Sequence, residues 1–256
     1  MSLPKVEFEI LEPKEYIDFF IYSAYEIPYF KERVHNRWPI FTELKSLPEK
    51  EKKTKLINYF NKKLIEEKEF FIQQKQLFQK NWNKINDEMM QIFEKVLETT
   101  WYIKKIKARL TYNPICPRNI HKHTFDIYYK YDTREIIKTT IHESLHYIWF
   151  KKWSEVFPNH NKEEFDSPHK IWKLSEFVVV IILNKPEFAN LIKKHFDIPT
   201  KFDTYITYKN GEIKTQEAEN LLKQELEEIY KNRESMEDFM KKSYEFIIEN
   251  DIFTEN

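Results

Sequence analysis

The segment His142-Glu143-Ser144-Leu145-His146 contains two histidines one helical turn apart, with an acidic residue directly after the first. Positions i and i+4 of an α-helix lie on the same face, so both imidazoles can reach a single metal ion. Glu143 lies about 100° around the helix axis from His142, near enough to accept a proton from a water held at the metal. The spacing therefore predicts a metal site with a general base beside it, provided that the segment is helical.

The flanking sequence predicts that this segment lies inside one amphipathic helix that ends near Val156. Asp132 is the expected N-cap, and Glu135 follows at the third helical position, which is a variant of the capping box. Pro158 cannot continue the helix. Side chains suited to a buried face recur at three- and four-residue steps: Ile136, Ile137, Thr140, Ile141, Leu145 and Ile148.

A second helix is predicted from Ser167 to Asn184, because Ser167 suits the N-cap and Pro168 suits the first helical position. Within it, Glu176 is the one acidic residue in an otherwise apolar run made up of Leu174 and Phe177 to Leu183. A carboxylate buried in such a helix is costly unless it meets a cation or coordinates a metal. Glu176 is therefore the expected third ligand, and zinc is the expected metal.

Two histidines from one helix and a glutamate from the next resemble the ligand set of the gluzincins. These are the branch of HExxH zinc metallopeptidases that includes thermolysin. The 30 positions between His146 and Glu176 suit that family. Over about residues 128–184 the chain also resembles a little-characterised group of predicted zinc metallopeptidases of low-GC bacteria. The residues that carry this further likeness are Phe150–Trp153, Ser167–His169, Trp172 and Leu174–Glu176.

The resemblance implies hydrolysis of peptide bonds by a metal-activated water, with Glu143 as general base. It also implies a small twisted sheet beside the metal helix, whose edge strand binds an extended peptide. The candidate edge strands are residues 106–113 and 124–131. Four residues are candidates for stabilising the developing oxyanion, and the sequence does not choose among them: His169, His195, Tyr205 and Tyr208.

One departure from the thermolysin pattern concerns support of the ligands. Those enzymes place an aspartate one turn after the third ligand to orient a histidine, but Val180 occupies that position here. Another residue must then support the ligands. His160, in a polar loop, and Asp166, just before the second helix, are rival third ligands, each with a simpler role as a surface residue or a helix-start acid.

Two other functions compete with a peptidase. The chain could be a non-catalytic, zincin-like metal-binding sensor or interaction module, although such a site has no use for Glu143. It could also be a helical interaction protein without metal, given the Lys- and Glu-rich helices of residues 49–99. Analysis of metal content distinguishes the metal-free interaction protein from the other two functions. Peptide hydrolysis that depends on Glu143 distinguishes the peptidase from the non-catalytic sensor or interaction module.

The composition limits the partners. Lysine plus arginine and aspartate plus glutamate both number 42, so we expect a peptide or protein substrate and neither nucleic acid nor membrane as partner. The single cysteine, Cys116, excludes an intrachain disulfide, and the polar N-terminal residues do not resemble a signal peptide. The longest apolar run is too short to span a bilayer. A cytoplasmic location is therefore expected, and the oligomeric state is not predicted.

The expected fold is α+β and mostly helical, with a zincin-like core and long helices at both ends. A helical region (1–100) is expected to precede a zincin-like region (101–256), either as separate regions or as one continuous domain. Strands are predicted at 5–10, 106–112 and 124–131, and helices at 13–33, 49–68, 69–99, 215–232 and 235–249. Asn210-Gly211 predicts a hairpin with a type I′ turn between 204–208 and 212–215.

Overall fold

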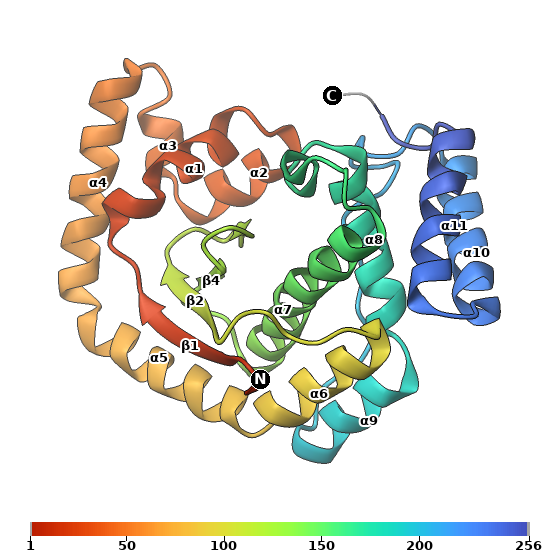
Figure 1. Ribbon diagram of the computed structural model, residues 1–256. Coiled ribbons are helices and arrows are strands. Elements are labelled where there is room, and N and C mark those ends of the chain that lie inside the picture. The colour runs from red at the N-terminus through yellow and green to blue at the C-terminus, as the bar shows by residue number, and fades with distance from the viewer. Residues whose placement is uncertain (1, 255–256) are drawn as a thin grey trace. The chain divides into compact units, whose positions relative to one another are not determined.

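The computed structural model describes residues 2–254, shown in Figure 1. Helices make up 62% of the chain, and the strands form one small mixed sheet, so the predicted mostly helical α+β class is confirmed. The chain divides into two units. The sheet unit consists of residues 5–84 and 105–139, and the helical unit consists of residues 2–4, 85–104 and 140–254. The zincin-like core and the division near residue 100 stay predictions.

The sheet unit contains four strands in the order β1-β2-β4-β3. β1, β2 and β4 are parallel, and β3 pairs antiparallel with β4. Alternate side chains are buried over most of β1 and the first half of β2, as expected where one face of a strand packs on a core, whereas all five residues of β4 are buried. The strands are β1 (Lys5–Ile10), β2 (Lys105–Thr111), β3 (Arg118–Asn119) and β4 (Thr124–Tyr128).

The three predicted strands are confirmed, but one prediction about the sheet edges is wrong. β2 is not an edge strand, because β1 pairs with it along its length on one side and β4 on the other. Six helices separate β1 from β2 in the sequence, so local patterns cannot reveal this parallel pairing. β4 has a short neighbour, because β3 pairs with it only at Thr124 and Phe125.

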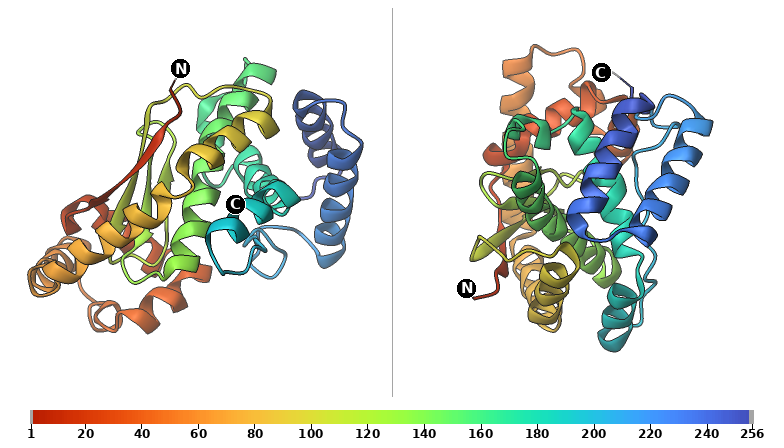
Figure 2. Two further views of the ribbon diagram at one scale, coloured as in Figure 1. Left: turned by 90° about the horizontal axis from the view of Figure 1, so that it is seen from below. Right: turned by 45° about the vertical axis from the view of Figure 1, so that its right-hand side comes forward.

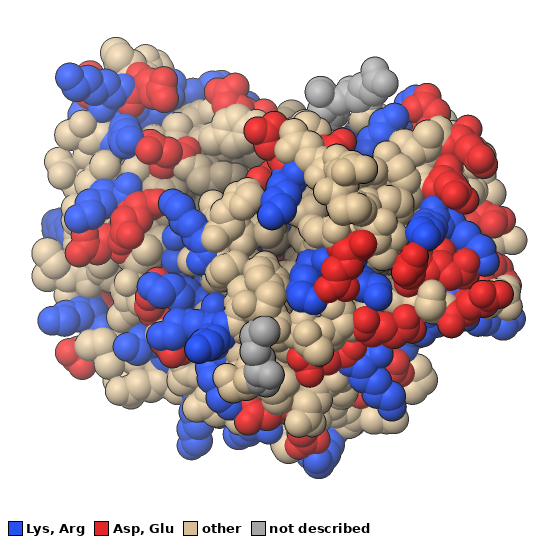
Figure 3. Space-filling view, viewed as in Figure 1, with Lys and Arg blue, Asp and Glu red and all other residues tan. Residues whose placement is uncertain are grey.

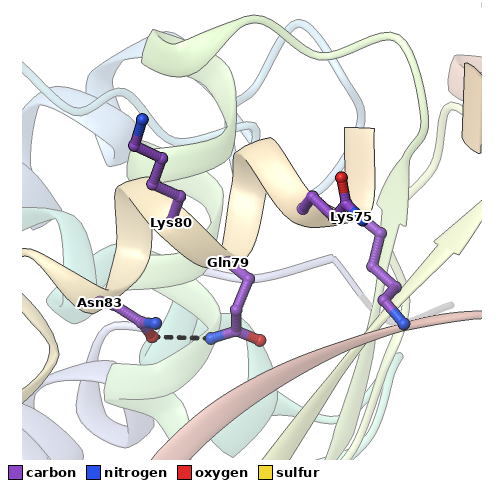
Figure 4. Close-up of a pocket in the computed structure, with 5 residues that line it drawn as sticks. Lys75, Gln79, Lys80 and Asn83 are labelled. Atoms are coloured by element: carbon purple, nitrogen blue, oxygen red, sulfur yellow. Dashed lines mark hydrogen bonds between the residues drawn. The ribbon is translucent and has the colours of Figure 1, made fainter. Parts of the chain in front are cut away.

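A side chain from α5 occupies the outer edge of β1. Gln79 accepts a hydrogen bond from the Phe8 N–H at 3.0 Å and donates one to the Val6 carbonyl at 3.0 Å. It also donates to Asn83, one turn further along α5, as Figure 4 shows. Unpaired backbone N–H and C=O groups at a sheet edge are a template on which a further strand can pair. Because Gln79 occupies two of these groups, it blocks the addition of a strand to β1. Any edge of this sheet that binds a peptide is therefore on the β4 side.

The helices of the sheet unit follow the predicted pattern with one break. The predicted helix 13–33 is wrong as a single element, because Pro28 lacks a backbone N–H and starts a new helix. The predicted helix 49–68 is confirmed. The elements are α1 (Pro13–Tyr25), α2 (Pro28–Arg37), α3 (Ile40–Glu43), α4 (Glu49–Glu66) and α5 (Lys68–Asn83).

The predicted helix 69–99 is also wrong as one element, because it is divided between α5 and α6 (Asn86–Leu97). Ile85 leaves the helical backbone conformation, with φ −124° and ψ −8°, and its side chain is buried. Burial of that apolar side chain outweighs the preference of the sequence for a continuous helix. The break coincides with the start of the helical unit.

The helix α7 (Thr133–Val156) confirms the predicted metal helix, including its bounds. Its capping box is formed: Glu135 N–H donates to Asp132 Oδ1 at 2.8 Å, and Asp132 N–H donates to Glu135 Oε2 at 3.1 Å. Residues 133–139 of α7 belong to the sheet unit, and residues 140–156 belong to the helical unit. The HExxH segment therefore lies wholly in the helical unit.

The second predicted helix is α8 (Lys170–Leu183), which begins later than expected. Ser167 and Pro168 are not its N-cap and first residue. The segment before it forms a short 3-10 helix, η1 (Lys162–Phe165), followed by a turn in which the His169 N–H donates to the Asp166 carbonyl at 3.2 Å. The backbone of His169 is not helical, at φ −64° and ψ 151°. His169 is the N-cap, because its carbonyl accepts the first helical hydrogen bond, from Lys173 at 3.0 Å.

The predicted hairpin at Asn210-Gly211 is wrong. Gly211 has a positive φ of 76° and the chain does turn, but the Thr207 carbonyl accepts from both Glu212 and Ile213, which makes a wider turn. Residues 212–214 pair instead with residues 252–254, through an antiparallel bridge between Ile213 and Phe253. A partner nearly forty positions away in the sequence competes successfully with the nearest one.

The remaining helices of this unit are α9 (Pro186–His195), α10 (Gln216–Asn232) and α11 (Met236–Glu249). The last two confirm the predicted helices, with Thr215 and Ser235 as N-caps. Figures 1 and 2 show α10 and α11 side by side, and both pack on α8. Acidic and basic side chains are mixed over the face drawn in Figure 3. Among the described residues, no helix is both long and apolar enough to cross a membrane.

Candidate metal centre

α7 presents the two histidines of the HExxH segment to one point. The Nε2 atoms of His142 and His146 lie 3.1 Å apart, as the i, i+4 spacing predicts. His146 is fully buried, whereas the side chain of His142 keeps 18% of its surface exposed. The pair is thus anchored in the core at one end and accessible from solvent at the other.

α8 brings the carboxylate of Glu176 to the same point. Its Oε2 lies 3.1 Å from His142 Nε2, and its Oε1 lies 3.4 Å from His146 Nε2. Only 2% of the Glu176 side chain is exposed. The fold therefore brings the three predicted ligands together. Among the described residues, this is the one place where three or more histidine, cysteine or acidic side chains are close enough to hold a metal ion.

Aromatic stacking connects the helices that carry these ligands. The ring of His146 lies parallel to Phe150, one turn further along α7, at 6.0 Å between centroids. Phe150 in turn stacks on Phe165 of η1 at 4.4 Å. Since η1 packs on α8, this column of rings links α7 to α8. The buried imidazole is held in orientation by packing as well as by its polar contacts.

The three side chains form a ligand triangle whose dimensions fit a metal ion. The two Nε2 atoms lie 3.1 Å apart, and each lies near a different oxygen of the Glu176 carboxylate, His142 at 3.1 Å from Oε2 and His146 at 3.4 Å from Oε1. In a tetrahedral zinc site with ligand distances of about 2.0–2.1 Å, neighbouring ligand atoms lie about 3.3 Å apart. Two imidazoles and one carboxylate also match the ligand types that zinc prefers. The group of His142, His146 and Glu176 can therefore hold a metal ion.

Hydrogen bonding alone accounts for this triangle less well. Each imidazole Nε2 has either one proton or one lone pair in the ring plane, so it supports one such hydrogen bond. If both nitrogens donate to Glu176, they stand 3.1 Å apart with no proton between them. A cation at the centre of the triangle interacts with all three lone pairs at once.

Glu143, the predicted general base, follows His142 on α7 and is 7% exposed. Burial of a carboxylate next to the ligands is costly unless it is compensated, as for Glu176. Glu143 is not one of the three residues of the ligand triangle. Its catalytic role stays a prediction.

The rival third ligands do not join the site. His160 accepts a hydrogen bond from the Trp153 indole N–H at 3.2 Å, and its ring stacks on Phe157 at 4.8 Å. It is packed among aromatic rings, so the expectation of a solvated surface histidine is also wrong. Asp166 is exposed and closes η1 through its backbone N–H to Glu163.

The four oxyanion candidates occupy different places. His169 is exposed at the start of α8, His195 lies 3.5 Å from Glu88 on α6, and Tyr208 is 41% exposed. Tyr205 packs on Trp172, whose position on α8 is one turn before Glu176. Of the four, Tyr205 is the one whose ring contacts the face of α8 that carries the ligand. Its role, like that of the others, stays a prediction.

Sequence reasoning missed a second buried charge on α8. Val180, which replaces the supporting aspartate of the thermolysin pattern, is buried and apolar. Lys173, three positions before Glu176, is fully buried. The signal was present, because Lys173 lies between Ile171, Trp172 and Leu174 and so has apolar neighbours in the sequence on both sides.

Comparison of the chain with protein-family models, with curated proteins and with solved structures finds no match. The side chains themselves are therefore the support for a metal centre. The likeness to gluzincins stays a prediction from the sequence.

Proposed function

We propose that this chain is a zinc-dependent metallopeptidase, with His142, His146 and Glu176 as metal ligands and Glu143 as general base. The observation that carries the proposal is the convergence of three side chains on an HExxH helix: the two imidazole Nε2 atoms lie 3.1 Å apart, and each lies within 3.4 Å of an oxygen of the Glu176 carboxylate. Three protein ligands leave a fourth coordination position for water or substrate, which distinguishes catalytic from structural zinc sites.

Exposure of the site supports a catalytic role. Structural zinc sites are closed, whereas a catalytic site must admit its substrate. The side chain of His142 is 18% exposed, while those of His146 and Glu176 are buried. A substrate would therefore approach from the His142 side.

The chain's own residues supply the proton transfers. Bound zinc would act as a Lewis acid that polarises the peptide carbonyl and makes a water more acidic. Glu143 accepts a proton as the water oxygen forms its bond to the carbonyl carbon. It then delivers that proton to the amine nitrogen as the carbon–nitrogen bond breaks. Water is consumed, a carboxylic acid and an amine are released, which become carboxylate and ammonium when the acid's proton passes to the amine, and Glu143 returns to its starting state.

The test compares the wild type with Glu143→Gln on a mixture of fluorogenic peptides, with zinc content measured on both proteins. The proposal expects hydrolysis by the wild type, a loss of about 100-fold or more in the variant, and equal zinc in both. Glutamine keeps the shape of the side chain but cannot accept the proton. Zinc without hydrolysis in the wild type would favour a non-catalytic sensor or interaction module.

The proposed substrate is a peptide or protein, and the proposed location is the cytoplasm. The location rests on the single cysteine, which suits a reducing compartment. Fractionation of cells that produce the protein tests it.

A further inference from the structure

Lys173 on α8 has a side chain with no exposed surface. A buried ammonium is costly unless oxygen atoms surround it. Its Nζ donates to the Thr254 carbonyl at 3.0 Å and to the Thr254 hydroxyl at 3.2 Å, and it lies 3.1 Å from the Glu212 carboxylate. Two residues from distant parts of the sequence thus converge on one lysine.

The atoms that hold Lys173 are themselves fixed by hydrogen bonds. The Thr254 hydroxyl donates to the Gly211 carbonyl at 2.7 Å, and the Thr254 N–H donates to the Glu212 carbonyl at 3.2 Å. We call residues 211–214 and 252–254 the Lys173 clamp. Because the two segments of the clamp pair with each other, they present a preformed set of acceptors to α8.

The opposite end of α8 has a second polar attachment. The Asn184 side chain donates to the Phe202 carbonyl at 3.0 Å and accepts from the Phe202 N–H at 2.8 Å. α8 is therefore tied at its first turn by Lys173 and at its C-cap by Asn184. Each attachment includes a residue of the segment between α9 and α10, Glu212 for Lys173 and Phe202 for Asn184.

Apolar packing cannot by itself determine the rotation of α8. Residues 174–183 are all buried, and all of them except Ser175 and Glu176 are apolar. This part of the helix is therefore surrounded by apolar contacts on every side. Hydrophobic contact is not directional, and a rotation by one residue, about 100°, would exchange one aliphatic side chain for another. The same rotation would carry Glu176 away from both histidines. Directional contacts must therefore distinguish the correct rotation.

We propose that Lys173 is a positioning residue of the metal site. Its hydrogen bonds and ion pair with the clamp fix the rotation of α8 about the helix axis, and this rotation directs Glu176 to His142 and His146. Lys173 lies one turn before Glu176, so a shift at one is transmitted to the other along the helix. This inference rests on the proposed metal site, and it assigns to Lys173 the support that Val180 does not supply.

The experiment measures zinc affinity by competition with a chromophoric chelator, and the visible absorption of the Co²⁺-loaded protein. Lys173→Met keeps the length of the side chain and removes its charge. We expect zinc to bind about 10- to 100-fold more weakly, as for outer-sphere partners of metal ligands, with an altered Co²⁺ spectrum. Circular dichroism checks that the variant is folded at the temperature used.

Two controls separate positioning from general stability. Lys170→Met removes a half-exposed lysine of the same helix, paired with Asp251 at 3.7 Å, and should leave zinc affinity unchanged. Ile192→Ala removes buried apolar contacts on α9 and should lower the melting temperature without changing the Co²⁺ spectrum. If Lys173→Met does not fold, Glu212→Gln weakens the clamp more gently and should reduce affinity several-fold.

The outcomes distinguish this inference from the proposed function. Wild-type protein that binds neither zinc nor Co²⁺ would overturn the metal site itself, and the role of Lys173 with it. Wild-type binding together with unchanged affinity and spectrum in folded Lys173→Met, or in folded Glu212→Gln where the first does not fold, would overturn only the positioning role.

Discussion

The Nε2 atom of His142 and the Oε2 atom of Glu176 lie 3.1 Å apart, although 34 positions separate the two residues in the sequence. The contact joins two helices, and it completes a triangle with His146. Burial of a carboxylate in an apolar helix is favourable only if positive charge compensates for the lost hydration. A divalent cation held by the three side chains would supply that charge.

Removal of metal should lower the stability of the helical unit. A ligand present at 1,000 times its dissociation constant stabilises the folded state by about 4 kcal/mol. For a unit of this size we expect a chelator to lower Tm by roughly 10 °C. Differential scanning calorimetry with and without chelator measures the shift, and His146→Ala should melt at the same temperature in both. If the protein is shown to carry zinc and its Tm is the same with and without chelator, packing alone holds α7 and α8 together.

Glu176→Gln should uncouple metal binding from folding. The amide keeps the size of the side chain but offers a weaker, neutral ligand, so zinc affinity should fall by more than about 100-fold, beyond the range typical of outer-sphere partners. The metal-free form should lose little stability, because it no longer buries a negative charge. Zinc titration and melting of the metal-free proteins measure both effects. Retention of wild-type zinc affinity would exclude Glu176 as a ligand.

The sheet unit should become less stable as pH rises through neutrality. Burial raises the pKa of Asp126 from 3.8 to about 7, against the opposing effect of Arg109, which contacts it at 2.6 Å. The folded state therefore binds the proton more tightly than the unfolded state. The resulting stabilisation is fully present below about pH 4 and is lost as pH approaches 7.

Comparison with Asp126→Asn tests this sign. Between pH 5 and pH 8 the wild type should lose more unfolding free energy than the variant, in which the group cannot ionise. Asp18→Asn, at an exposed residue paired with Lys53, is the matched control and should follow the wild type. Parallel profiles for the wild type and Asp126→Asn would show that Asp126 is ionised throughout.

The features that could be predicted from the sequence depend on neighbouring residues. The capping box at Asp132 and Glu135 marks the start of α7, and the apolar spacing continues it to Val156. The histidine pair follows from helical geometry. Glu176 could be identified because a single acidic residue in a buried helix needs a cation as partner, and this requirement can be inferred without knowing which part of the structure supplies the cation.

The features that could not be predicted depend on distant partners. Residues 212–214 pair with 252–254 and not with the strand across the Asn210-Gly211 turn, because the distant segment offers both backbone partners and the buried Phe253. The parallel neighbours of β2 come from opposite ends of its unit. Lys173 gains its role only from Thr254 and Glu212, and no local pattern connects these residues.

The zinc content of purified wild type and His146→Ala, by elemental analysis after dialysis against metal-free buffer, tests the central claim most directly. His146 is fully buried and lies within 3.4 Å of both other ligands. We expect about one zinc per chain in the wild type and almost none in the variant. Equal zinc in the two proteins, or none in a wild type supplied with zinc, would contradict it.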